Sequence, residues 1–190
     1  MSNTCNRTQN YSTRGVTVES ASKFGFVVIV PEFQPGDIRL TCQIIKSSFP
    51  GYPARVCLPV GVSDKDYEFC SKLGLPIDRG ITTVTSLINT GVRKSEADWN
   101  FVLMPGAKPT QNLIKKFLYF CRDDRDVLYP VVRRKVAFYE AAVSGIFFNR
   151  TVNGELPARE PDLNMARLIW AAKAMSDGSQ FKAIVGGAFN

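Results

Sequence analysis

The strongest constraint on the fold is a series of nearly continuous apolar runs separated by amphipathic segments. Phe24–Phe33 (FGFVVIVPEF) is rich in β-branched residues and is broken by proline, which is typical of a strand buried on both faces. Ala54–Val60 and Trp99–Met104 repeat the pattern. Because such runs alternate with helical segments of about ten to fourteen residues, the sequence predicts an α/β fold with a mostly parallel sheet.

The amphipathic segments predict helices that begin at capping residues. Asp37, Thr110 and Asp162 each precede a stretch with apolar residues at helical spacing, so each is expected to cap a helix. The last helix is predicted to turn four apolar side chains toward the core: Leu163, Ala166, Ile169 and Trp170.

Ligands of a parallel sheet bind beyond the carboxyl ends of its strands. This rule selects four loops as the candidate site: Pro31–Asp37, Val60–Asp64, Met104–Thr110 and Asn149–Asp162. None of them contains a glycine-rich dinucleotide fingerprint, a phosphate-binding P-loop or a nucleophile elbow, so these three classes of site are unsupported.

Length and polarity predict a single domain with a tail. A chain of 190 residues is expected to form one domain, over residues 23–190. Residues 1–22 are too polar to bury much surface and are interpreted as a mobile arm. We expect no membrane span, because no apolar run approaches about 18 residues, and no secretory signal, because the start of the chain lacks an apolar stretch.

Cysteine and histidine usage limits the available chemistry. The chain has five cysteines (Cys5, Cys42, Cys57, Cys70 and Cys121) and no histidine. Their wide spacing gives no zinc signature, and four of them lie among apolar residues, which indicates buried free thiols. This usage predicts a reducing compartment, and the cytoplasm is the expected location. Without histidine, acid–base chemistry falls to Asp, Glu, Lys, Tyr or Cys.

The formal net charge of +7 favours an anionic partner. The basic residues are spread along the chain, however, and the densest group, Arg122–Lys135, is interleaved with aspartates. A nucleic-acid-binding module is therefore the weaker alternative to a nucleotide-linked substrate. The Asp123–Asp126 segment (DDRD) precedes a predicted strand, and we interpret it as a surface loop at the amino end of the sheet.

The order of the motifs resembles the family 2 glycosyltransferases of the GT-A fold. The similarity spans roughly residues 24–175 and rests on four motifs: VVIVPEF, SSFPGYPARVCLPVGVSD, NTGVR and WNFVLMPGAKP. The resemblance implies a three-layer α/β/α domain. It also implies transfer of a sugar, with inversion, from a nucleotide-sugar donor to an unknown sugar, lipid or protein acceptor.

The first loop carries the resemblance to the donor site. Pro31, Glu32 and Phe33 stand where this family grips the nucleotide base, although a packed strand end explains them equally well. In the second loop Gly61 and Asp64 match the family pattern, but its two leading acidic residues are missing. Asp64 is alternatively a helix cap.

The helix before the third strong strand carries a further match. Asn89 and Arg93 fit the family's helix at this point, which implies a role beside the donor. For Arg93 the two readings are a contact with a donor phosphate and a solvated arginine at the end of a helix.

The metal-binding motif of the family is absent. Its two aspartates would fall at Met104 and Gly106, which offer no oxygen ligand to a hard cation. We therefore assign no metal ligands and no cofactor, although metal use stays open. Lys108 and Arg93 are the candidates to offset the charge of a leaving diphosphate.

An acidic pair opens the last predicted helix. Glu160 and Asp162 resemble the motif that holds the catalytic base, with Glu160 the better match; helix capping by Asp162 is the alternative. Because this pair is retained while the donor-side acids are lost, two functions remain. One is a glycosyltransferase, and the other is a non-catalytic relative that binds a nucleotide, a sugar or a protein.

Overall fold

The computed structural model describes residues 24–31, 37–131, 144–160 and 162–185, and its strands form one sheet. The strands are β1 (Phe24–Ile29), β2 (Ala54–Pro59), β3 (Ile77–Ile81), β4 (Trp99–Leu103), β5 (Asp126–Val131), β6 (Ile146–Asn149) and β7 (Gln180–Val185). Their order across the seven-stranded sheet is β3-β2-β1-β4-β6-β5-β7. Only β6 runs antiparallel to its neighbours β4 and β5 within these residues, so the predicted α/β fold with a mostly parallel sheet is confirmed. The predicted arm over residues 1–22 lies outside the described residues.

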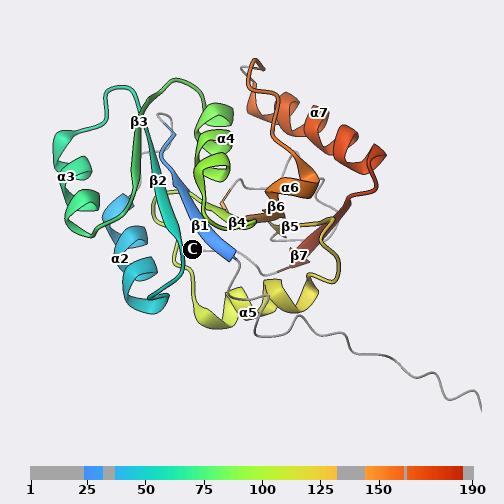
Figure 1. Cartoon of the computed structure of the whole chain (residues 1–190), viewed down its shortest axis with the longest axis horizontal. Helices are drawn as coiled ribbons and strands as arrows, with labels where there is room; N and C mark the ends of the chain where they lie inside the picture. Colours follow the sequence, from blue (N-terminus) through green and yellow to red (C-terminus); the bar gives the residue numbers. More distant parts are fainter. Residues whose placement is uncertain (1–23, 32–36, 132–143, 161, 186–190) are drawn as a thin grey trace, which may run out of the picture.

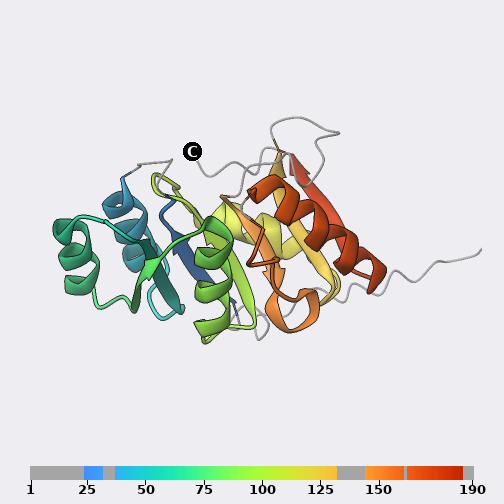
Figure 2. The same cartoon turned by 90° about the horizontal axis from the view of Figure 1, so that it is seen from above.

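Helices cover both faces of the sheet (Figures 1 and 2). They are α2 (Ile38–Ser48), α3 (Asp64–Lys72), α4 (Val84–Lys94), α5 (Gln111–Phe120), α6 (Arg150–Asn153) and α7 (Leu163–Ser176). Buried side chains of α2, α3 and α5 join one hydrophobic cluster, and those of α4 and α7 join the other. The domain therefore has the predicted three layers. Within the described ranges, no helix combines the length and apolar character needed to cross a membrane.

The central strands form a platform that is buried from solvent on both faces. All six residues of β1 are buried, and its side chains alternate between the two clusters, with Phe26 on one face and Val27 on the other. On the Phe26 face, the rings of Phe101 and Phe147 stack with centroids 4.1 Å apart. This packing explains why the strand segments read as continuous apolar runs, and it fixes the points from which the loops leave the sheet.

The major helices begin at the carboxyl end of the sheet and run back toward its amino end, as parallel α/β connections require. Five side chains cap their first turns: Asp37, Ser63, Thr83, Thr110 and Asp162. The caps predicted at Asp37, Thr110 and Asp162 are confirmed. Asp64, however, is the first residue of α3, and Ser63 caps this helix instead.

The prediction for the core face of α7 is partly wrong. Ala166 and Trp170 are buried, as expected, but Ile169 is 45% exposed and Arg167 is buried in its place. Burial lowers the pKa of the Arg167 guanidinium to about 10. The error arises because α7 is apolar on more than one side, so spacing alone could not identify the face that packs on the sheet.

The segment Asn149–Asp162 does not start where the sequence predicted. Because β6 is antiparallel to β4, its last residue, Asn149, pairs with Trp99, the first residue of β4. The segment therefore begins at the amino end of the sheet. It includes α6 and reaches the carboxyl end only at the start of α7. A short apolar strand carries no mark of its direction, which is why the sequence did not reveal the reversal.

The described cysteines are buried free thiols, as predicted: Cys42, Cys57, Cys70 and Cys121. Burial raises the pKa of the Cys57 and Cys121 thiols to about 12. These two groups are therefore protonated at neutral pH and are poor nucleophiles. Cys5 lies outside the described residues.

The DDRD segment lies at the amino end of the sheet, as predicted, but it is not entirely a surface loop. Asp126 is fully buried as the first residue of β5. Its carboxylate accepts hydrogen bonds from the backbone N–H groups of Arg122 and Asp123, and it pairs with the Lys182 ammonium at 2.7 Å. Asp126 thus closes the turn after α5 and ties β5 to β7.

Asp78 on β3 lies between two cations. Its carboxylate accepts hydrogen bonds from Arg55 at 2.8 Å and from Lys94 at 2.5 Å, and its side chain is 11% exposed. Burial acts to raise the pKa of this carboxyl. The hydrogen bonds from Lys94 and Arg55 outweigh that effect, so the net shift of the Asp78 pKa is downward.

This shift predicts a pH-dependent contribution to stability. Because the folded-state pKa is depressed, the Asp78 carboxylate stabilises the fold above its unfolded pKa of roughly 3.9. The contribution is lost as the pH falls through the folded-state pKa. We expect Asp78→Asn to lower the free energy of unfolding at pH 7, with a smaller difference from wild type at pH 3, as measured by urea denaturation. Asp98→Asn, at an exposed position, is the control, and a gap that stays constant with pH would contradict this account.

Candidate functional site

The turn after β4 is docked firmly at the carboxyl end of the sheet. The Ala107 N–H donates to the Met104 carbonyl, and Gly106 has a φ of 86°, a backbone conformation that favours glycine. The Gly106 N–H donates to the Asp37 carbonyl at 3.2 Å, and the Thr41 hydroxyl donates to the Ala107 carbonyl at 3.0 Å. The turn and the first turn of α2 therefore form one unit.

Side chains of this turn supply no metal ligand. Met104, Pro105 and Ala107 are buried, whereas Lys108 is exposed. Among the residues that the structure describes, no group of three or more His, Cys, Asp or Glu is arranged to hold a metal ion. The chemistry that this turn offers a ligand is backbone polarity and the ammonium of Lys108.

The strand order β2-β1-β4 places the ends of β1 and β2 on one side of this turn, with β1 next to it. Pro31 is buried at the end of the first loop's described part, while Glu32 and Phe33 lie outside the described residues. In the second loop Gly61 has a φ of 84° and is exposed. Asp64 is also exposed, and its carboxylate pairs with Arg79 at 3.1 Å.

The structure also forms a charged cluster, which includes Asp64 of the second loop and which the sequence analysis missed. It consists of Arg39, Asp64, Asp66 and Arg79, from α2, α3 and β3. The Arg39 guanidinium pairs with Asp66 at 3.2 Å, and the Arg79 guanidinium lies 4.3 Å from the centroid of the Tyr67 ring. An arginine two residues after the Asp37 cap was the available signal, but no local pattern indicates that α2 and α3 meet there.

Asn89 and Arg93, both on α4, have separate placements. The buried Asn89 amide donates to the Leu156 carbonyl at 2.7 Å and accepts from the Leu156 N–H at 2.9 Å. Asn89 thus anchors the segment that leads to α7, because both its amide nitrogen and its amide oxygen are hydrogen-bonded to the Leu156 backbone. Arg93 is exposed in the last turn of α4, at the amino end of the sheet. This placement does not fit the expected contact between Arg93 and a donor phosphate.

Glu160 and Asp162 lie at the start of α7, at the carboxyl end of the sheet. The Asp162 carboxylate accepts from the Met165 N–H at 2.8 Å, and the Glu160 carboxylate accepts from the Asp162 N–H at 3.1 Å. Glu160 is half-buried and Asp162 is exposed. Both groups take part in the helix start, and each carboxylate has a second oxygen for other partners.

The direction of the helices contributes a positive electrostatic potential at the carboxyl end of the sheet. Because the five major helices begin here, the positive ends of their dipoles point toward the carboxyl end of the sheet. Backbone N–H groups and positive dipole ends favour anions. With the overall charge of +7, this end is suited to a ligand that carries phosphate.

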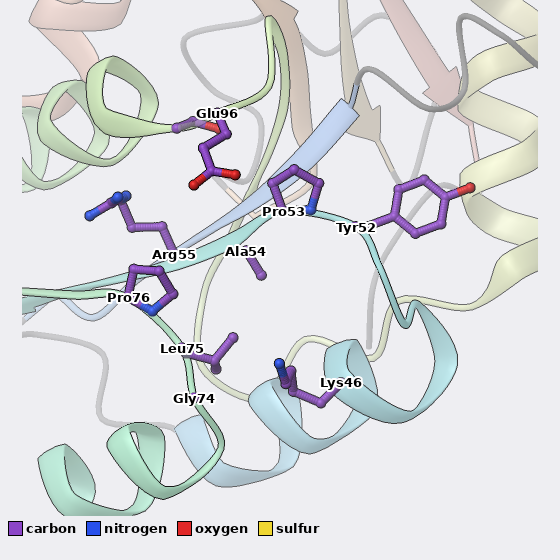
Figure 3. A pocket seen from close by; sticks show the side chains of 10 residues that line it. Lys46, Tyr52, Pro53, Ala54, Arg55, Gly74, Leu75, Pro76 and Glu96 are labelled. Atoms are coloured by element: carbon purple, nitrogen blue, oxygen red, sulfur yellow. The ribbon is translucent and has the colours of Figure 1, made fainter.

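A pocket of about 180 Å³ lies at the opposite, amino end, and it is not part of this site. Figure 3 shows the Lys46 ammonium and the Glu96 carboxylate on different sides of it, with Ala54 between them and Leu75 near Lys46. A second pocket, of about 210 Å³, is lined by Trp99 and Phe147 and also lies at the amino end. Since ligands of parallel sheets bind at the carboxyl ends of strands, we do not place the donor in either pocket.

Three solved structures share this fold at low sequence identity. A cytidylyltransferase from Leptospira borgpetersenii serovar Hardjo-bovis aligns with a TM-score of 0.58 and 13% identity, over 88% of this chain and 78% of that chain. S. aureus TarS 1–349 aligns with a TM-score of 0.58 and 14% identity, over 87% of this chain. The chain spans 59% of the length of that TarS structure. A 4-diphosphocytidyl-2C-methyl-D-erythritol synthase aligns with a TM-score of 0.56 and 14% identity, over 86% of this chain and 90% of that chain.

These similarities establish the fold. The seven-stranded, mostly parallel sheet with helices on both faces matches the arrangement of these nucleotidyltransferase-like and GT-A-like structures, so the predicted fold class is confirmed. No protein-family model matches the chain, and no curated protein matches its sequence.

Proposed function

We propose that this protein is a transferase that takes a sugar from a nucleotide-sugar donor, bound at the carboxyl end of the sheet. The observation that carries the proposal is the convergence there of the loops after β1, β2 and β4 with the start of α7. In this proposal the nucleotide lies on the three loops, and Glu160 supplies a carboxylate at the same end of the sheet. Two of the structural neighbours are, by name, a cytidylyltransferase and a diphosphocytidyl-compound synthase, which supports a nucleotide-linked substrate.

In the proposed complex, Pro31 and Gly61 flank the nucleotide. Glu32 and Phe33 remain predicted contacts of the base, and Asp64 remains a predicted contact of the second loop. The exposed Asp64 carboxylate is paired with Arg79. The hydrogen bond from Arg79 goes to one carboxylate oxygen, so the other oxygen can accept from a ribose hydroxyl.

The proposed transfer uses two charged groups. Glu160 removes a proton from the acceptor hydroxyl, the hydroxyl oxygen attacks the sugar carbon, and the nucleoside diphosphate leaves with the bonding electrons. Lys108, which is exposed at this end, offsets part of the negative charge that develops on the diphosphate through its ammonium group. This pathway uses no metal held by side chains after β4. The acceptor is left open among sugars, lipids and proteins.

A second function is favoured by one observation. The turn after β4 presents Met104, Pro105 and Ala107, all buried, where a metal-dependent transferase would present acids. A protein with this turn could bind a nucleotide or nucleotide sugar without turning it over. Binding and transfer therefore have to be measured separately.

Ligand-dependent stabilisation tests the proposal. The full chain is heated with UDP-, GDP- and CMP-sugars, and with CTP, each in Mg²⁺ or in EDTA. We expect one nucleotide class to raise the Tm by a few degrees, equally in both conditions, because a ligand at 100 times its Kd adds about 2.7 kcal/mol. Transfer or hydrolysis of the stabilising donor then separates the transferase from the binder. Stabilisation by no nucleotide would refute both functions, and stabilisation only in Mg²⁺ would refute the metal-free pathway.

A further inference from the structure

Helix α7 carries an exposed apolar stripe on its outer side. The large members are Met165 (47% exposed), Leu168 (42%), Ile169 (45%) and Met175 (60%), and the exposed Ala172 lies between them. These five positions follow the helical repeat and share one face of the helix. They are called the α7 stripe below. In Figures 1 and 2, α7 lies at the periphery of the molecule.

The exposed apolar side chains of the described residues are concentrated on α7 and are not scattered over the surface. The described residues include eight large apolar side chains that are exposed, and four of them belong to α7. Single exposed apolar residues are ordinary, whereas a contiguous patch marks an interaction surface.

The exposure of the stripe does not mean that α7 packs on the sheet through the wrong face. The opposite side of α7 is already buried against the sheet through Ala166, Trp170, Ala171 and Ala174. The Trp170 indole N–H also donates to the Asn153 carbonyl at 2.8 Å, which fixes the rotation of the helix. A helix held in this way keeps its second apolar side available for another molecule.

The charge around the stripe argues for a protein partner instead of a membrane. Helices that lie on anionic membranes carry rows of lysine and arginine beside the apolar face. The basic residues of α7 are Lys173 and the buried Arg167, so no such row exists on this helix. A neutral apolar stripe fits best against another apolar stripe.

The spacing of the stripe makes it complementary to itself. Met165 and Met175 lie five positions on either side of residue 170, and Leu168 and Ala172 lie two positions on either side. If two copies of α7 cross antiparallel about a two-fold axis at this point, Met165 meets the partner's Met175 and Leu168 meets the partner's Ala172. A large side chain then faces a small one, which lets two helices pack closely.

We propose that the α7 stripe is a homodimer interface, in which two copies of the protein pair their α7 helices antiparallel about a two-fold axis near position 170. Specific protein–protein interfaces bury at least about 1,000 Å² in total, and an interface made of one helix face from each copy is expected near that lower limit. We expect a weak dimer that dissociates in the micromolar range, which the measurement below covers. This inference is independent of the proposed enzymatic function.

Sedimentation equilibrium of the full chain tests the dimer. From about 1 to 200 μM, we expect the mean mass to rise from 21.1 kDa toward twice that value. Leu168→Glu should keep the protein monomeric over this range, because it places a charge opposite the partner's Ala172. Tyr119→Glu, which changes a side chain on α5 that is 64% exposed, is the matched control and should leave the dissociation constant unchanged. Circular dichroism verifies that each variant is folded.

Cysteine cross-linking tests the register. In a Cys5→Ser background, Met165→Cys protein mixed with Met175→Cys protein should form a disulfide-linked dimer with an added copper oxidant, whereas each variant alone should link far less. A wild-type chain that is monomeric at every concentration would overturn the proposal. A dimer that survives Leu168→Glu, or one in which Met165→Cys links mainly to itself, would also overturn it.

Discussion

Gly91→Ala is expected to cost the protein about 3 kcal/mol of its free energy of unfolding, near the upper end of the range for overpacked cores. A β-carbon on Gly91 would lie 2.2 Å from Cγ1 of Val27 and 2.9 Å from the sulfur of Cys57. Both neighbours are fully buried in the sheet, so neither can move aside without disturbing the platform. The better helix propensity of alanine, worth about 1 kcal/mol, offsets only part of this cost.

Thermal and urea denaturation measure the effect. For a chain of this length we expect the Tm to fall by roughly 6–12 °C. Thr90→Ala, at the neighbouring half-buried position of α4, is the matched control and should change the free energy of unfolding by about 0.5 kcal/mol or less. If Gly91→Ala is as stable as wild type, α4 is not held against β1 and β2 as closely as the structure indicates.

Glu160→Gln is expected to lower the transfer rate by about 10²- to 10⁴-fold, the usual contribution of a general base. Glutamine keeps the oxygen that accepts the Asp162 N–H, so the start of α7 should remain intact while the proton acceptor is lost. The rate of product formation at saturating donor, measured with the nucleotide sugar that stabilises the protein, reports the loss. Donor binding should be nearly unchanged.

Two variants separate catalysis from helix capping. Asp162→Asn keeps a good cap, because asparagine caps helices as well as aspartate does, but it removes the charge. We expect its transfer rate to stay within a few-fold of wild type, since Glu160 is the assigned base. Glu155→Gln, at an exposed position of the same segment, serves as the control. Full activity of Glu160→Gln would show that this carboxylate acts only at the helix start.

The fold was predictable from the sequence because its signals are local. The apolar runs at β1, β2 and β4 and the caps at Asp37 and Thr110 depend on neighbouring residues, and the structure confirms them. The reversed direction of β6 was not predictable, since strand direction is set by pairing with distant segments. The missing acids after β4 did not weaken the fold prediction, because the core and not the loop specifies the sheet.

The site was harder to predict because a residue that supports the fold and a residue that binds a ligand can match the same sequence motif. Asn89 matched a family motif, but its amide holds the Leu156 backbone. Gly91 in the same motif is needed for the close approach of α4 to the sheet. The charged cluster went unnoticed because it forms only when α2, α3 and β3 come together, and the outer apolar side of α7 concealed which face is buried.

An NMR titration of the full chain with the stabilising nucleotide sugar, in EDTA, tests the central claim most directly. We predict amide shift changes at Gly61, Gly106 and Lys108, at the carboxyl end of the sheet, and little change at Gly74 and Glu96, which line the pocket at the amino end. The same changes should appear when Mg²⁺ replaces EDTA. Changes confined to the amino end, or changes that require Mg²⁺, would contradict a metal-independent donor site at the carboxyl end.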